Sequence, residues 1–122
     1  PFIPIKISYG HKLSFEFNAM VDSGASRNLF PAVFGQQAGI NIQKGKQVKL
    51  LGIGDKEIIG YSHKIKIYLN GITFETEADF SFEQRFPLLG RSGFFNLFQK
   101  VIFDETFHQL QLVVRSTEHR IN

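Results

Sequence analysis

Apolar and polar residues alternate with a period of two along much of the chain. The alternation runs from Ile3 to Tyr9 and resumes from Leu13 to Phe17 after a short break. A period of two places successive side chains on opposite faces of a strand. The pattern therefore predicts two strands joined at residues 9–12.

A longer hairpin is predicted in the second half of the chain. Residues 64–70 alternate in the same way, and the alternation continues over residues 72–82. Asn70–Gly71 lies between the two runs and is a favoured sequence for a two-residue hairpin turn. In the second strand we expect Glu77 and Asp79 to lie on the solvated face.

Shorter elements complete the expected fold. Val101–Phe103 and Leu110–Val114 are predicted strands, with a turn over residues 104–108. Pro31–Gly39 is typical of a short helix, because proline suits a first turn and glycine follows a helix end. Arg91–Phe98 is predicted to be a second helix of about two turns, with its aromatic side chains facing the core.

Length and composition fit one mostly β domain over residues 1–114, with a polar tail, 115–122, that is expected to fray. The 122 residues are 43% hydrophobic and 20% charged, as in a folded globular domain. Cysteine is absent, which excludes disulfides and thiolate chemistry and favours a cytoplasmic location. No apolar run approaches the roughly 20 residues of a membrane helix. A start at Pro1, without methionine or a signal-peptide pattern, favours a processed fragment.

Charge and histidine spacing disfavour two classes of function. The 14 basic and 11 acidic residues give a net charge of +3, and the basic residues are scattered. A nucleic-acid binder usually presents a basic face with interleaved aromatics, so no nucleic-acid partner is expected. The four histidines lack close metal-ligand spacing, so we expect neither a metal site nor a cofactor.

The segment Ala19–Ser26 carries the strongest chemical signal. Apolar residues run directly into Asp22, and the small residues Ser23, Gly24 and Ala25 follow. A carboxylate at the end of a buried strand is costly unless hydrogen bonds or a partner satisfy it. Glycine lets another backbone approach the loop closely. An Asp-Ser-Gly tripeptide alone is also a common turn, so this segment by itself leaves both interpretations open.

Three further segments occur in a distinctive order. Leu50–Gly54 has a Leu-Gly-Ile-Gly pattern ahead of the long predicted hairpin, Phe86–Arg91 contains Leu-Leu-Gly, and Gly93–Asp104 follows. Together with Asp-Ser-Gly-Ala, this ordered set resembles the retropepsin-like aspartic proteases over roughly residues 3 to 114. The resemblance implies a retropepsin-like barrel in which the hydrophobic-Gly segment threads the aspartate loop. It also implies that Gly93–Asp104 supplies the helix and strand that close single-domain prokaryotic members.

The resemblance implies an aspartic endopeptidase that is active as a homodimer. Two neighbouring carboxyls can share one proton and activate a water against a peptide bond. One Asp-Ser-Gly per chain means that a second copy must supply the second Asp22. The Ser23 hydroxyl would then hydrogen-bond across the axis, Ala25 would support the loop, and Gly24 would let the substrate backbone lie against it.

The expected substrate is an extended polypeptide bound as a β-strand. A mobile flap would close over it, formed by Gly52, Ile53 and Gly54. Arg85 would add a preference for acidic side chains. The expected substrate pockets are lined by Leu29, Arg85, Phe86 and Leu88.

Two features depart from the family pattern. In many retroviral members the arginine matching Arg91 bridges to an acid that here is replaced by Ser26. We therefore expect Arg91 to cap local carbonyls or to form an ion pair with Glu16 or Asp104. The hairpin over residues 101–114 is expected to take over dimerisation from the interleaved termini of viral members. The alternative function is a catalytically silent β-barrel that dimerises or binds peptides.

Overall fold

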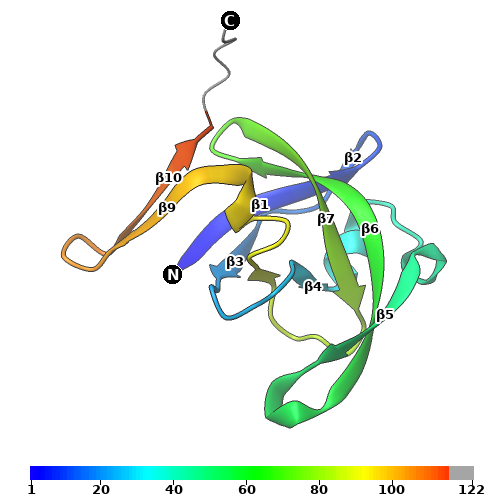
Figure 1. Ribbon diagram of the computed structural model, residues 1–122. Coiled ribbons are helices and arrows are strands. Elements are labelled where there is room, and N and C mark those ends of the chain that lie inside the picture. Colours follow the sequence, from blue (N-terminus) through cyan, green and yellow to red (C-terminus); the bar gives the residue numbers. More distant parts are fainter. Residues whose placement is uncertain (116–122) are drawn as a thin grey trace, which may run out of the picture.

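The computed structural model describes residues 1–115, except for the side chain of Ile53. Six strands of this part of the chain close into a barrel (Figure 1). Neighbouring strands in this barrel pair in a ring, and the last pairs again with the first. In order around the ring they are β1 (Phe2–Tyr9), β3 (Phe17–Val21), β8 (Leu88–Leu89), β4 (Leu29–Pro31), β7 (Ile72–Ser81) and β6 (Glu57–Leu69).

The remaining elements extend or cover this ring. Strand β2 (Lys12–Leu13) pairs with the end of β1, and β5 (Lys46–Leu51) pairs with the first half of β6. Helix α1 (Ala32–Gln37) directly follows β4. Strands β9 (Phe98–Asp104) and β10 (Gln109–Val114) form a separate hairpin, which projects from the side of the barrel in Figure 1.

The barrel interior is filled by alternate residues of its strands, as a period of two requires. Phe30 of β4 contacts Phe17 and Phe80 edge to face, and Phe17 stacks on Phe34 of α1 with ring centroids 4.0 Å apart. Burying a large apolar side chain contributes roughly 1.5–3 kcal/mol to stability. The fully buried apolar side chains include Ile5, Ile7, Phe30, Ile67, Phe80, Leu89 and Phe94.

The mostly β class and the long hairpin are confirmed. Leu69 pairs with Ile72 across the two-residue turn, where Asn70 has φ +47° and Gly71 φ +74°. Both values lie in the left-handed region that a type I′ turn needs at both central positions. The predicted first helix is confirmed as α1, and the turn after β9 is confirmed at residues 105–108.

The predicted strand Leu13–Phe17 is wrong in its middle. The chain leaves the ladder after Leu13, and β3 begins only at Phe17. Ser14 is buried at the break, where its Oγ accepts a hydrogen bond from the Ile7 amide at 3.0 Å. Phe15 consequently points outward and is 77% exposed. A side-chain hydrogen bond to the neighbouring strand has replaced a ladder bond, which alternation alone does not reveal.

The predicted helix Arg91–Phe98 is also wrong. Only a 3₁₀ turn forms over Phe95–Leu97, and Phe98 already begins β9. Gly93 has φ +102°, a backbone conformation incompatible with a continuous right-handed helix. The expected burial nevertheless holds, because Phe94 and Phe98 both lie in the core.

Of the expected polar tail 115–122, only Arg115 lies within the described residues. Its Nη2 donates a hydrogen bond to the carbonyl oxygen of Asn96 at 2.9 Å. Residues 116–122 lie outside the described part of the chain. No helix among the described residues is long and apolar enough to cross a membrane.

Candidate active site

Asp22 directly follows β3, where the chain leaves the barrel sheet. Strand β3 runs parallel to β8, with Val21 opposite Leu89. The Asp22 amide continues this pairing by donating to the carbonyl oxygen of Leu89 at 3.0 Å. Its backbone is thus fixed by a strand far along the chain, while the residue as a whole is half-buried.

The loop after Asp22 folds back on the carboxylate. The amide of Gly24 donates to Asp22 Oδ1 at 2.8 Å, and the amide of Ala25 donates to the Asp22 carbonyl oxygen at 3.1 Å. A charge-assisted bond from a backbone amide orients the carboxylate. Ser23 and Gly24 are exposed, so this side of the loop is open to a partner.

The segment after β8 passes against the outgoing half of the loop. The amide of Arg91 donates to the Ala25 carbonyl oxygen and that of Ser92 to the Ser26 carbonyl oxygen, both at 2.9 Å. Gly90 lies so close to the Arg27 backbone that a Cβ at this position would overlap its carbonyl group. Glycine is therefore required at position 90 for the two segments to meet.

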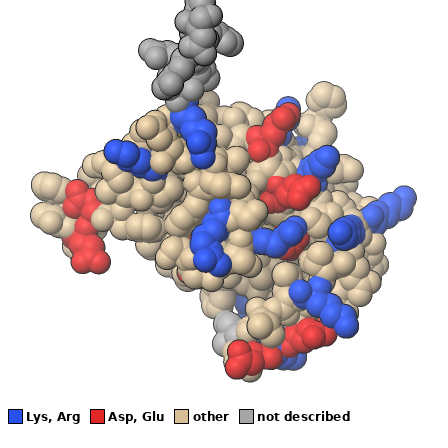
Figure 2. Space-filling model, in the orientation of Figure 1, with Lys and Arg blue, Asp and Glu red and all other residues tan. Residues whose placement is uncertain are grey.

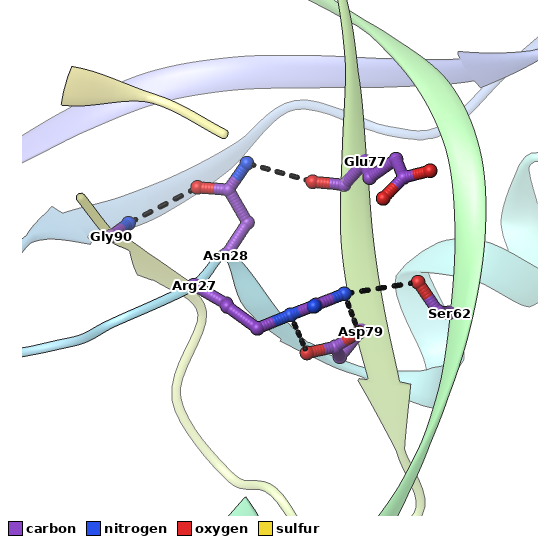
Figure 3. A network of polar contacts seen from close by, with 6 residues as sticks. All are labelled: Arg27, Asn28, Ser62, Glu77, Asp79 and Gly90. Atoms are coloured by element: carbon purple, nitrogen blue, oxygen red, sulfur yellow. Dashed lines mark hydrogen bonds and ion pairs between the residues drawn. The ribbon is translucent and has the colours of Figure 1, made fainter. Parts of the chain in front are cut away.

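Asn28 ties these two segments to β7. Its side chain is fully buried; Oδ1 accepts a hydrogen bond from the Gly90 amide at 3.1 Å, and Nδ2 donates to the Glu77 carbonyl oxygen at 3.0 Å. Both ends of the amide are satisfied by backbone groups (Figure 3). A buried amide with a backbone partner at each end stabilises one geometry of the loop.

The cavity at Asp22 has a volume of about 780 Å³. A separate cavity of about 610 Å³ lies beside the turn after β1. Asp22, Gly24 and Ala25 form one wall of the cavity at Asp22, and the end of β5 forms another. Three of the four predicted pocket residues line it, namely Leu29, Phe86 and Leu88. The fourth, Arg85, instead lines an adjoining cavity of about 330 Å³.

The predicted flap lies at the tip of the β5–β6 hairpin. Gly52 lines the cavity at Asp22, and its amide donates to the Lys56 carbonyl oxygen at 2.6 Å. Ile53–Asp55 form a 3₁₀ turn in which Gly54 has φ +73°. The side chain of Ile53 lies outside the described part of the structure. Next to the tip, Leu51 lines the cavity and is 75% exposed.

An ion pair in the cavity wall was not predicted from the sequence, and the prediction that Asp79 is solvated is wrong. Asp79 has an exposed fraction of 0% and binds Arg27, whose side chain is 41% exposed (Figure 3). Nε donates to Oδ2 at 2.7 Å and Nη2 to Oδ1 at 2.9 Å, and Nη2 also donates to Ser62 Oγ at 3.1 Å. Glu77, two residues earlier, is exposed as expected.

Neither suggested partner of Arg91 binds it in the described part of the chain. Arg91 is exposed, and ion pairs among the described residues involve Arg27 with Asp79 and Lys49 with Glu57. Its contribution here is through its backbone amide, which braces Ala25. Among the described residues, no group of three or more His, Asp or Glu side chains is placed to hold a metal ion.

Comparison with solved structures identifies the fold. A retropepsin-like aspartic protease from Rickettsia conorii superposes with a TM-score of 0.64 at 18% identity, covering 85% of this chain and 85% of that one. The EIAV protease, solved with an inhibitor, superposes with a TM-score of 0.57 at 17% identity, covering 75% and 81%. No family model matches the sequence, and no curated protein matches it significantly. The chain has the fold of the retropepsin-like aspartic proteases.

Proposed function

We propose that the protein is an aspartic endopeptidase that hydrolyses peptide bonds in extended polypeptide segments. The observation that carries this proposal is the position of Asp22, whose oriented carboxylate faces a cavity of about 780 Å³ between its loop and the β5–β6 hairpin. Asp22 from each of two copies would form the catalytic pair. One carboxylate would accept a proton from the attacking water while the other, protonated, would donate to the substrate carbonyl.

The homodimer is part of the same proposal. Ser23 and Gly24 are exposed beside Asp22, so the loop can approach its equivalent in a second copy. The Ser23 hydroxyl would hydrogen-bond across the axis and hold both loops in place. The β9–β10 hairpin would add area, because Ile102 and Val113 are partly exposed on its outer face.

Substrate binding would use both walls of the cavity. Leu29, Phe86 and Leu88 offer apolar surface for side chains near the cleaved bond. The hairpin tip over Gly52–Gly54 would close over the peptide and exclude water. Binding as an added β-strand would draw affinity from main-chain hydrogen bonds and specificity from alternate side chains.

A peptide-library digest with the wild type and Asp22→Asn side by side tests the activity. Asparagine retains an oxygen that can accept the Gly24 amide but cannot serve as a base, so we expect cleavage to fall by several orders of magnitude. Circular dichroism of both proteins checks that the fold is retained. Peptide binding without cleavage by the wild type would favour the silent peptide-binding barrel instead.

A further inference from the structure

The ion pair between Arg27 and Asp79 lies in the wall of the cavity at Asp22, although the proposed chemistry does not require it. Its two ends differ in exposure: the carboxylate is fully buried, whereas the guanidinium side chain is 41% exposed. The pair is therefore a fixed dipole with its negative end inside the protein. Its positive end is the part that a bound molecule can reach.

The Arg27 guanidinium has more hydrogen-bond donors than its partners among the described residues use. Of its five N–H groups, Nε donates to Asp79, and Nη2 donates to Asp79 and to Ser62. In the described part of the chain no group accepts a hydrogen bond from Nη1, which carries the remaining two N–H groups. The fork of Nε and Nη2 is occupied by Asp79, so an incoming carboxylate would accept charge-assisted hydrogen bonds from Nη1.

The guanidinium is also held rigidly. Two bonds to Asp79 and one to Ser62 join it to the adjacent strands β7 and β6, where Ser62 and Asp79 are direct cross-strand neighbours (Figure 3). Lys49 lines the same cavity but is 73% exposed and approaches Glu57 only to 3.9 Å. A preorganised cation loses less conformational entropy on binding than a mobile one.

The strand order sets the distance from the proposed chemistry. Strands β8 and β4 lie between β3, which ends at Asp22, and β7, which carries Asp79. With a strand spacing of about 4.8 Å, β7 lies three spacings from β3, roughly 14 Å along the curved sheet, so the guanidinium lies on the order of 10–15 Å from Asp22. An extended peptide rises roughly 3.3 Å per residue, so a side chain at Arg27 belongs to a residue a few positions from the cleaved bond.

We propose that Arg27 is a specificity-determining residue that selects peptides with an aspartate or glutamate at one position, a few residues from the cleaved bond. This inference rests on the proposed function, because it assigns a substrate class to the same cavity. The preference for acidic substrate side chains, which the sequence suggested for Arg85, is thereby assigned to Arg27. Arg85 lines the adjoining cavity instead.

General attraction by the protein's positive charge would act differently. Lysine and arginine side chains are spread over the face shown in Figure 2, with acidic side chains among them. A diffuse field of this kind favours any acidic peptide, wherever the charge lies, and is screened by salt. A contact with Arg27 favours one position.

The test uses short peptides that carry glutamate or glutamine at each position in turn. Their binding is measured by fluorescence anisotropy to Asp22→Asn, which cannot turn them over, and their cleavage is measured with the wild type. We expect glutamate to be preferred about tenfold at one position, as for a charge-assisted hydrogen bond. Adding Arg27→Gln and Asp79→Asn together should abolish the preference. This pair removes both charges, and Asp79→Asn keeps the shape of the buried side chain, so no unpaired buried carboxylate remains.

Arg85→Gln is the matched control, because it removes one positive charge beside the adjoining cavity and should leave the preference intact. A positional preference that survives in the Arg27→Gln/Asp79→Asn protein, or that disappears in Arg85→Gln or Lys49→Gln instead, would overturn the inference. So would equal binding of both peptide series. Binding and cleavage separate the two proposals: selective binding without any cleavage by the wild type would reject the protease function and retain the role of Arg27.

Discussion

Gly90 lies against the backbone of Arg27, so closely that a methyl group at position 90 would overlap the Arg27 carbonyl. The contact joins the end of β8 to the loop that carries Asp22, and the Asn28 side chain bonds the Gly90 amide beside it. The arrangement of the candidate active site therefore depends on the absence of one side chain.

Gly90→Ala should consequently destabilise the protein. We expect a loss of unfolding free energy on the order of 2 kcal/mol, because backbone atoms must move to accommodate the methyl group. Urea denaturation measures the change. Gly10→Ala is the control, because a Cβ at Gly10 meets nothing within 4 Å and the strain comes only from its φ of +65°. Equal losses in both variants would show that the contact with Arg27 is not close in solution.

Removing one partner of the Arg27–Asp79 ion pair should lower the stability of the protein more than removing both charges. Arg27→Met leaves the Asp79 carboxylate buried and unpaired, and we expect a loss on the order of 3 kcal/mol. Arg27→Gln/Asp79→Asn should recover most of that loss. Urea denaturation of the wild type, Arg27→Met and the double variant measures the three unfolding free energies. If Arg27→Met is as stable as the double variant, Asp79 must be hydrated rather than buried.

Leu51 offers a test of the flap. It lines the cavity yet is 75% exposed, so Leu51→Asp should lower kcat/KM by at least about tenfold with little change in melting temperature. The buried Ile58 is the contrasting position, where Ile58→Asp should unfold the protein. A strong loss of stability in Leu51→Asp would place this side chain in an ordinary core.

Dilution and pH test the shared catalytic pair. Specific activity of the wild type should fall as the protein is diluted below its dimer dissociation constant. Association should weaken as the pH rises, because two neighbouring carboxyls cannot both ionise without repulsion. Asp22→Asn removes that repulsion and should dimerise more tightly at neutral pH, with less dependence on pH. Sedimentation equilibrium of the wild type and of Asp22→Asn at several pH values, from about 4 to about 8, measures both effects of pH. A monomer that is fully active when dilute would rule out a shared site.

The elements predicted from local pattern are those whose determinants are local. The β6–β7 hairpin needs only alternation and Asn70–Gly71, and α1 needs a proline at its start and a glycine after its end. The helix predicted at residues 91–98 failed because Gly93 adopts φ +102° to let Ser92 and its neighbours contact the Asp22 loop. That requirement comes from residues far away in the sequence, which a short window does not contain.

Part of the candidate site was predicted from the sequence, and part was not. Asp22, Gly24 and the Leu-Leu-Gly segment come together as the resemblance implied, because each has a distinctive local sequence. Asp79 has no such signal: it follows an alternating pattern that matches an exposed face. Its burial depends on Arg27, and only the tertiary structure brings the two together.

The parallel pairing of β3 with β8 also determines when the site can form during synthesis. Met20 and Asp22 find their hydrogen-bond acceptors in Pro87 and Leu89, and the loop beyond them is braced by residues 90–92. A nascent chain cannot assemble this loop until residues 87–92 have left the ribosome. Contacts of such long sequence separation close late in folding, because a large loop entropy must first be overcome. Asp22 therefore leaves the ribosome well before the residues that complete its site, and the candidate site forms only after synthesis has passed residue 92.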